Sequence, residues 1–314
     1  MTRSEPMKQQ QRTGGGHLAW LLLVLTTAGH AQDLEPRRWS HLPLGTDFAG
    51  LGYAYSEGDI AFDPVLRIED GTVEMHSMGA KYIHSFSLLD KSARFDLLQT
   101  FQSGSWSGVL NGVPTAVERS GWADTTLRFA VNLYGAPPLS GKEFAEYRAA
   151  HADCETIVGA GLAVVLPTGE YFDDKLINLG GNRCVARPQL GIVHSRGKWT
   201  MELTGAASFY DANDDFWNGN RLEQDPLGSL ESHLIYTVRP GWWLGGSAGY
   251  DFGGRSSING AEKNDRRNQL SWALTVGAAI TPQVGLKLSY LGTRTQEKVG
   301  TNLDTIAVAI SVLW

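Results

Sequence analysis

The chain has 314 residues, a formal net charge of −6, 42% hydrophobic residues, 37 glycines and two cysteines. Its acidic balance argues against nucleic acid as a partner, because no basic face supplies the charges that neutralise phosphates. The many glycines and the scarcity of helical periodicity indicate a protein built from strands and turns.

The first 31 residues are typical of a secretory signal peptide. Three basic residues precede the apolar run Leu18–Leu25, and small residues follow at Ala28, Gly29 and Ala31. A membrane anchor is the alternative, but the run is shorter than the roughly 20 apolar residues of a spanning helix. We therefore divide the chain into a signal peptide over residues 1–31 and one further domain over residues 32–314.

Segments in which apolar residues occupy every second position recur along the mature part. In a strand this pattern gives one apolar and one polar or small face. The segments span residues 51–55, 78–88, 94–101, 127–133, 157–166, 187–192, 201–209, 230–238, 244–252, 270–280, 284–290 and 306–314. The last of them ends on an aromatic residue, Trp314, which is also the last residue of the chain.

Short and long connectors alternate between these segments. The short ones are residues 89–92, 195–198, 240–241 and 281–282, and the long polar ones are residues 57–73, 104–121, 169–183, 211–225, 253–267 and 295–302. Outer-membrane barrels sort their connectors in this way, with short periplasmic turns and longer external loops. A soluble β-sandwich also has alternating strands but has no reason to sort its loops by length.

The pattern predicts an all-β fold, a transmembrane antiparallel up-and-down β-barrel of about 12 strands in the bacterial outer membrane. Lipid requires the closure, because an open sheet edge would leave backbone groups without partners. The expected partners are outer-membrane lipids and lipopolysaccharide, a small-molecule solute, and the barrel-assembly machinery, which would bind the C-terminal strand.

One connector on the periplasmic side is longer than this pattern allows. Residues 135–155 include a stretch, Lys142–Ala150, that predicts a short amphipathic helix with Phe144 and Tyr147 one turn apart. Two interpretations remain open: a surface helix packed under the rim, or a lid over the periplasmic mouth.

The two cysteines of an exported chain suggest a disulfide. The strand order, however, places Cys154 at the periplasmic end and Cys184 near the outer rim, too far apart for the Cα spacing of about 5.5 Å that a bridge requires. We expect no bond between them.

Four strings resemble the MetA-pathway of phenol degradation family. They are Asn132–Pro137, Pro167–Tyr171, Ile177–Arg183 and Gln224–Leu227. The resemblance covers residues 43–314 and departs at Cys184, where the family usually has a tryptophan after the Asn-Arg pair, which affects the packing of the rim. It implies an outer-membrane transporter or channel and links the protein to aromatic catabolism without identifying the solute.

If the apolar stripes face lipid, ten charged or titratable side chains face the lumen. They are Lys81, Arg94, Asp96, Arg128, Arg187, Glu202, Glu231, His233, Asp251 and Lys287. Because both signs are present, they could form ion pairs that hold the wall together. They could instead line a narrow polar pore for passive passage, in which the arginines attract anions or small phenolic or carboxylate solutes.

The alternatives are a plugged structural or adhesion barrel and a lipid-modifying enzyme. The best candidates for a hydrolytic Ser–His pair are His84–Ser85 and His194–Ser195, but adjacent strand residues point to opposite faces. We therefore expect no catalytic residues and no enzyme.

No cofactor-binding motif occurs, and the histidines lack metal-ligand spacing. The acidic residues of the 211–225 loop could bind Ca²⁺ between lipopolysaccharide headgroups, or could simply be solvated. These acidic residues are Asp211, Asp214, Asp215, Glu223 and Asp225. We expect no cofactor.

Overall fold

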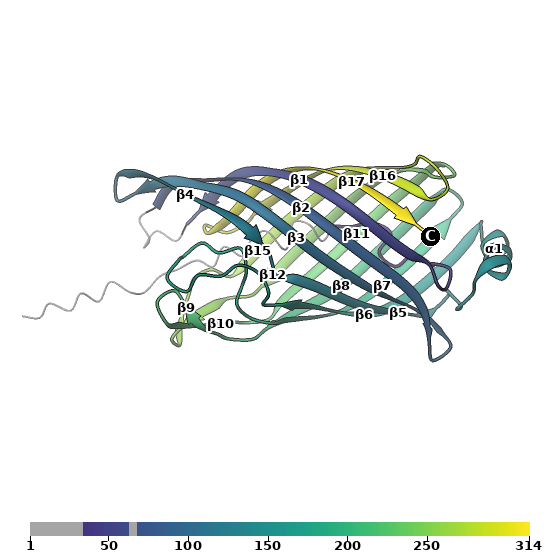
Figure 1. Cartoon of the computed structure of the whole chain (residues 1–314), viewed down its shortest axis with the longest axis horizontal. Coiled ribbons are helices and arrows are strands. Elements are labelled where there is room, and N and C mark those ends of the chain that lie inside the picture. The colour runs from purple at the N-terminus through teal and green to yellow at the C-terminus, as the bar shows by residue number, and fades with distance from the viewer. Residues whose placement is uncertain (1–33, 63–67) are drawn as a thin grey trace, which may run out of the picture.

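The computed structural model describes residues 34–62 and 68–314, so the predicted signal peptide, residues 1–31, lies outside the described residues. Twelve antiparallel strands form a closed barrel, as the alternating segments predict (Figure 1). In barrel order they are β1 (Asp47–Ala61), β2 (Ile68–Leu88), β3 (Lys91–Leu110), β5 (Thr125–Tyr134), β6 (Cys154–Leu166), β7 (Val185–Arg196), β8 (Trp199–Tyr210), β11 (Leu227–Arg239), β12 (Trp242–Gly253), β15 (Arg267–Ala279), β16 (Val284–Thr295) and β17 (Gly300–Leu313).

The first and last strands close the barrel. Phe48 of β1 lies opposite Leu313 of β17 on one side and opposite Ile83 of β2 on the other. The backbone N–H groups of Asp47 and Trp314 donate to each other's carbonyl oxygens, both at 3.0 Å. The C-terminal aromatic residue therefore lies at the seam, where its backbone completes the pairing.

The predicted loop over residues 57–73 is mostly strand, because β1 and β2 pair as far as Ile60 and Gly71. Beside them a hairpin extends the wall further. β4 (Val113–Trp122) pairs with the second half of β3, residues 101–110, and β5 pairs with the first half, residues 93–98. The prediction of a long polar loop over residues 104–121 is wrong. Asn111 and Gly112 have φ values of 51° and 81°, the left-handed pair that a tight two-residue hairpin turn uses. The Gly- and Ser-rich composition of this stretch concealed the strand pairing.

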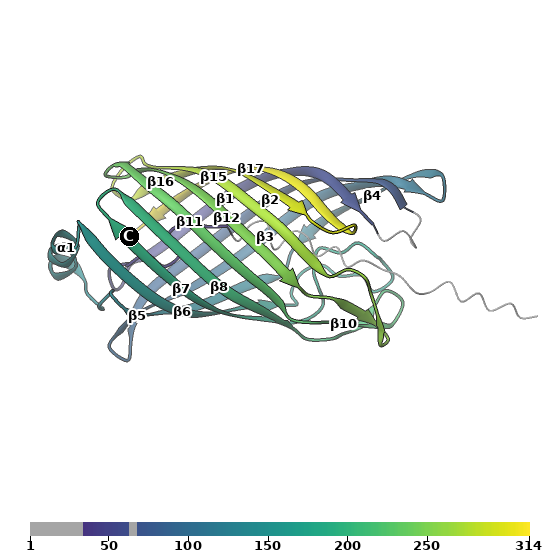
Figure 2. The same cartoon turned by 180° about the vertical axis from the view of Figure 1, so that it is seen from behind.

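A small sheet covers the end of the barrel opposite the C-terminus (Figures 1 and 2). Its strands are β9 (Asn213–Phe216), β10 (Asn220–Gln224), β13 (Ser256–Ile258) and β14 (Ala261–Glu262). They lie within connectors 211–225 and 253–267, which the sequence predicts to be loops, so that prediction is incomplete. We call this sheet, together with residues 167–184, the outer cap.

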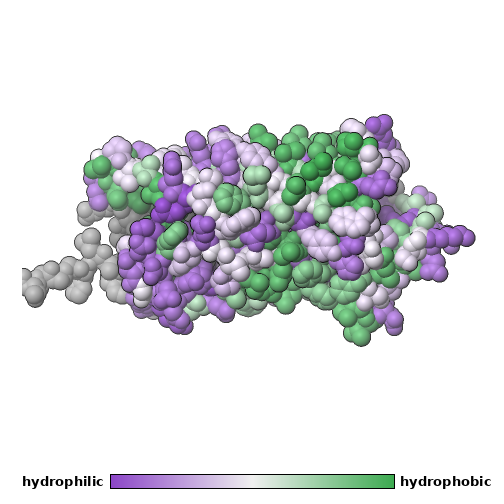
Figure 3. Space-filling view, in the orientation of Figure 1, coloured by the Kyte–Doolittle hydropathy of each residue, from purple (hydrophilic) through white to green (hydrophobic). Residues whose placement is uncertain are grey.

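The two faces of each barrel strand differ as the alternation predicts. Large apolar side chains are exposed on the outside, among them Leu51 and Leu190 at 65% and Leu274 at 61%. Figure 3 shows hydrophobic residues gathered over the barrel wall and hydrophilic ones around the outer cap. An apolar band of this kind suits hydrocarbon, whereas the opposite face is mostly polar or small.

The predicted periplasmic helix is α1 (Gly141–Ala150), which lies beyond the rim at the end of the barrel that holds the C-terminus (Figure 1). None of its ten residues is buried. Across the part of the chain that the structure describes, no helix is long and apolar enough to cross a membrane.

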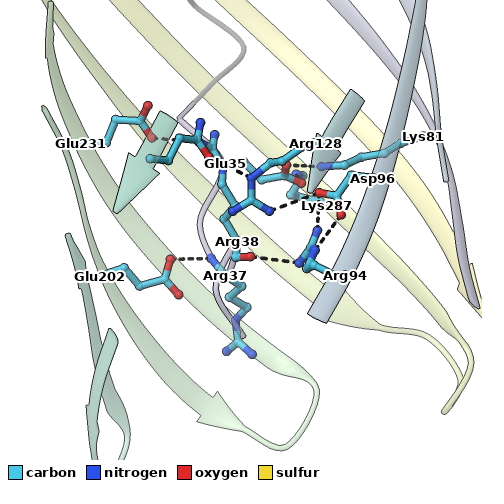
Figure 4. Close-up of polar contacts among 11 residues, drawn as sticks. Glu35, Arg37, Arg38, Lys81, Arg94, Asp96, Arg128, Glu202, Glu231 and Lys287 are labelled. Atoms are coloured by element: carbon cyan, nitrogen blue, oxygen red, sulfur yellow. Dashed lines mark hydrogen bonds and ion pairs between the residues drawn. The ribbon is translucent and has the colours of Figure 1, made fainter. Parts of the chain in front are cut away.

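The residues before β1 lie inside the barrel, a position that no pattern in the sequence predicts. Residues 34–46, which we call the tail, run from the periplasmic rim into the barrel interior (Figure 4). Leu34, Arg38, Trp39 and His41 are all less than 9% exposed. Leu34 packs with Ala273 of β15 and Leu291 of β16, whereas Trp39 bonds to Thr204 of β8, so the tail extends across the lumen.

Candidate functional site

The ten residues predicted to face the lumen all occupy inward-facing positions of their strands. Five of them, Asp96, Arg128, Glu202, Glu231 and His233, are less than 9% exposed. Lys81, Arg94, Arg187, Asp251 and Lys287 are partly buried. The alternation therefore assigned the faces correctly, while a pore-lining role for these residues remains a prediction.

Part of this set forms an ion-pair cluster within the wall. Arg94 donates from Nε and Nη2 to the two carboxylate oxygens of Asp96, each at 2.7 Å. Arg128 lies 3.5 Å from the same carboxylate and donates from Nε to Gln189 Oε1 at 2.9 Å. Two guanidinium groups thus share one carboxylate, which leaves a local excess of positive charge.

The tail supplies the opposite charges for much of the remaining set (Figure 4). The Glu35 carboxylate pairs with the Lys81 ammonium, and its Oε1 lies 3.3 Å from Lys287 Nζ. On the far side, the Arg38 guanidinium lies 3.4 Å from the Glu231 carboxylate.

The backbone of the tail is held as well. The N–H of Arg37 donates to Glu202 Oε2 at 2.8 Å, and the carbonyl oxygen of Arg38 accepts from Arg94 Nη1 at 3.0 Å. A charged lumen wall without such partners would be costly where water is scarce. The tail therefore matches the lumen in charge, acidic toward the basic wall and basic toward the acidic wall.

At the periplasmic rim, His41 joins the tail to the α1 connector. Its Nε2 donates to the carbonyl oxygen of Pro137 at 2.7 Å, and its ring packs edge-on against Phe144 and Tyr147. Burial lowers the pKa of His41, although the Pro137 bond and the nearby Glu155 carboxylate act in the opposite direction. The α1 connector thus holds the tail where it enters the barrel.

The sequence reasoning missed the tail residues Glu35, Arg37, Arg38, Trp39 and His41. One signal was available: some fifteen residues separate the predicted cleavage site from β1, and they combine both charge signs with a tryptophan. A linker needs neither. A local pattern could not predict where the tail lies, because partners such as Arg38 and Glu231 are far apart in sequence.

The two candidate Ser–His pairs are separated in the structure. The Ser85 hydroxyl donates to the carbonyl oxygen of Pro43 at 2.5 Å, while the His84 ring contacts Asp47 at 2.9 Å. Ser195 and Thr200 share a hydrogen bond of 2.9 Å. Each serine thus bonds to a group other than its neighbouring histidine.

A Ser–His contact that the sequence analysis overlooked lies inside the barrel. Ser247 Oγ and His233 Nδ1 are 2.7 Å apart, and Ser247 stands in a Gly-x-Ser-x-Gly string, Gly245–Gly249. The string lies within β12, whose backbone groups pair with β11 and β15. A nucleophile elbow instead needs a sharp strand-to-helix turn that exposes the serine.

Cys154 and Cys184 are both free, as expected. Within residues 34–62 and 68–314, no group of three metal-ligating side chains gathers. In the acidic 211–225 loop, Arg221 pairs with both Asp214 and Glu223. Asp214 and Glu223 therefore have a basic partner within their own connector.

Among solved structures, the chain resembles an outer membrane channel from Pseudomonas putida F1, with a TM-score of 0.73 and 22% identity over 90% of this chain and 100% of that one. A mutant of the TodX monoaromatic hydrocarbon channel gives a TM-score of 0.49 with 8% identity, covering 87% of this chain and 90% of that one. The transport unit of the autotransporter AIDA-I from Escherichia coli gives 0.47 with 9% identity, covering 85% and 90%. The first likeness shows the fold of an outer-membrane barrel, and the other two are too distant to support an argument.

No curated protein matches the sequence. A family model described as "Putative MetA-pathway of phenol degradation" matches residues 54–305, nearly the whole barrel. The resemblance drawn from the four strings is thereby confirmed. The chain belongs to this family and has the fold of an outer-membrane β-barrel.

Proposed function

We propose that the protein is a passive outer-membrane channel for small solutes, including phenol-type aromatic compounds, and that the tail sets its resting conductance. The observation that supports this most strongly is that the tail, which joins the barrel at β1, lies in a polar lumen and pairs Glu35 and Arg38 with wall residues of opposite charge. A permanent core would be expected to be apolar, since buried ion pairs rarely add stability over well-packed hydrophobic residues.

The outer surface supports the membrane setting. Side chains at the lipid-facing positions of β17 are largely exposed, with exposed fractions of 57% for Ile306 and 52% for Ile310. Trp314, which follows at the rim, is 62% exposed. This strand is the segment that the barrel-assembly machinery would bind during insertion. Outer-membrane lipids contact the apolar band, and lipopolysaccharide contacts the polar surface around the outer cap.

The family supports aromatic compounds as the solute class, because its description refers to phenol degradation. Passive passage suits a closed barrel of twelve strands, which is intermediate between side-chain-filled barrels of eight strands and open porins of sixteen. The resulting passage would be narrow even after the tail has left.

Single-channel conductance of the refolded mature protein in a planar bilayer tests the proposal. One variant lacks residues 32–42, which include the described part of the tail inside the lumen, and a second lacks residues 138–153, which include α1. We expect small or rare conductance steps in the intact protein. After removal of the tail, the conductance steps should be at least severalfold larger. Removing α1 should change conductance much less, because it takes away the ring contacts of Phe144 and Tyr147 with His41 but leaves the ion pairs of the tail inside the lumen.

A plugged structural barrel is the second candidate, favoured by the occupied lumen. It predicts that the intact protein never conducts, with folding verified by heat-modifiable mobility in gels, even if the variant lacking residues 32–42 does. That result would overturn the channel proposal. Larger steps only after removal of residues 138–153 would instead make α1 the lid.

A further inference from the structure

Trp39 of the tail lies in a recess built from three adjacent strands. Gly159 of β6 lies directly opposite Gly191 of β7, which in turn lies opposite Thr204 of β8. All three positions are on the lumen face. The indole ring, only 2% exposed, lies over this row.

The floor of the recess depends on the absence of side chains. A Cβ atom at Gly191 would lie 2.2 Å from Trp39 Cε2, and one at Gly159 would lie 2.5 Å from Trp39 Cε3. Real Cβ atoms do not approach other atoms so closely, and glycine in a strand interior often marks a close approach of another group. The wall is therefore hollowed at the place where a flat ring lies.

The remaining contacts recognise the ring by its chemistry. The guanidinium carbon of Arg128 lies 4.6 Å from the ring centroid, a cation–π contact. Trp39 Nε1 donates to Thr204 Oγ1 at 2.9 Å. Ala130, Ile157 and Val193 belong to the same apolar cluster.

Arg128 is held in place by groups of the wall itself. Its Nε donates to Gln189, and Asp96 lies beside its Nη1. The cation over the recess is thus anchored independently of the tail. When Trp39 leaves, the glycine floor, the cation and the hydroxyl acceptor remain on the wall.

We propose that this recess is a binding site for a small planar aromatic solute bearing a hydrogen-bond donor, such as a phenol or an indole, and that Trp39 occupies it in cis. The inference rests on the proposed channel function and names the class of solute that the lumen selects. The aromatic ring would lie on the glycine floor under Arg128, and its O–H or N–H would donate to Thr204.

Competition with Trp39 links binding of the solute to opening of the tail. A tethered group competes at an effective concentration near the millimolar range, so the intact protein should bind free solute weakly. A solute that binds only after Trp39 has left shifts the equilibrium toward the undocked tail. The recess would thus couple the arrival of an aromatic solute to release of the tail.

The test measures binding of 5-fluoroindole by ¹⁹F NMR to the folded mature protein in detergent. We expect Trp39→Ala to bind at least about tenfold more tightly than the wild type, because the tethered competitor is gone. The variant lacking residues 32–42 should behave like Trp39→Ala, so the result does not depend on one substitution.

A second substitution tests the hydrogen bond. In the Trp39→Ala background, Thr204→Val keeps the shape of the side chain but removes the acceptor, and should weaken 5-fluoroindole by about fivefold to tenfold. Binding of 4-fluorotoluene, which has no donor, should not change. Thr275→Val is the matched control, because Thr275 is also buried and bonded, to Ser289, on another part of the wall.

Failure of 5-fluoroindole to bind to either tail variant would overturn the inference. Equal affinities of Thr204→Val and Thr275→Val for 5-fluoroindole would also overturn it, because binding would then not depend on a hydrogen bond from the solute to Thr204. The channel proposal is judged separately by conductance. Larger conductance steps without 5-fluoroindole binding would support the channel and refute the aromatic site. Binding without any conductance would support the aromatic site and refute the channel.

Discussion

The tail lies inside the barrel and the outer cap covers its outer end, and the two are attached in different ways. Every segment of the outer cap is fixed at both of its ends by barrel strands, and Phe216, Leu222 and Ile258 give it an apolar core. The tail is continuous with the barrel only at β1 and is held mainly by polar contacts and by the rings of Trp39 and His41. A segment fixed at one end can leave at the cost of its own contacts alone, so the tail is the part suited to move.

The anchoring of the cap supports this contrast. The backbone N–H groups of Gly169 and Gly181 donate to the two oxygens of Asp124, each at 2.8 Å. Asn213, 1% exposed, donates to the Tyr171 hydroxyl at 2.9 Å and accepts from Asn182 at the same distance. The Asn213 bonds fix the fold of the cap itself, and the Asp124 bonds tie it to the β4–β5 connector. The bonds of the tail instead join it to a wall that is complete without it.

The largest expected effect comes from reversing the charge of the tail. Glu35→Lys would place a third ammonium group beside Lys81 and Lys287, and like charges at such distances cost several kcal/mol. We expect the tail to leave and single-channel conductance at low ionic strength to rise about tenfold. Adding Lys81→Glu should restore part of the resting state.

Glu262→Lys serves as the control for this charge change, because Glu262 pairs with Arg255 on the exposed cap. Its conductance should match the wild type. Equal conductance in Glu35→Lys and the wild type would show that ion pairing does not hold the tail, and the contrast between tail and cap would lose its basis.

A smaller effect is expected at the cap. Asp124→Ala removes the acceptor of two backbone N–H groups and should cost about 2–4 kcal/mol of local stability. Hydrogen exchange of residues 169–181 should accelerate while exchange of residues 34–46 stays unchanged. Asp174→Ala, which removes an exposed partner of Lys175, is the control. Loosening of the tail together with the cap would contradict their independence.

The smallest expected effect is that of pH on the rim. Because burial lowers the pKa of His41 in the docked tail, protonation favours the undocked tail. The contribution of His41 to docking is present above the ordinary histidine pKa of about 6.5 and is lost as the pH falls below it. Channel opening should therefore increase about twofold between about pH 7.5 and about pH 5.5.

His41→Gln isolates this contribution from other titrating groups. The variant should lose the part of the pH response that belongs to His41 while keeping any response of the lumen carboxylates. Identical pH profiles for the variant and the wild type would show that His41 does not contribute to release of the tail.

Much of the barrel follows from local geometry. Alternation along β17 places Ile306, Val308 and Ile310 on one face wherever the strand lies, because successive side chains point to opposite sides. The same rule put Glu202 and Arg128 in the lumen before any pairing was known. Connector length then fixed which end of the barrel is which, and α1 was evident from its own periodicity.

Local rules failed where composition disguised pairing. The Gly- and Ser-rich stretch over residues 104–121 has the composition of a loop, yet β3 and β4 pair along it. The short strands of the cap were missed for a related reason: β9 and β10 are four and five residues long and are stabilised by packing on one another. Such elements exist only once the barrel brings their connectors together.

The sequence by itself determined the class of protein, the number of strands and the polarity of each face, because these depend on periods of two residues that any strand reproduces. Only the tertiary structure decided what fills the lumen. Trp39 meets Gly159, Gly191 and Thr204, and Arg38 meets Glu231, only after the barrel has closed. The partners of the tail are distributed around the whole wall, and no pattern along the chain encodes a contact between residues that only closure makes neighbours.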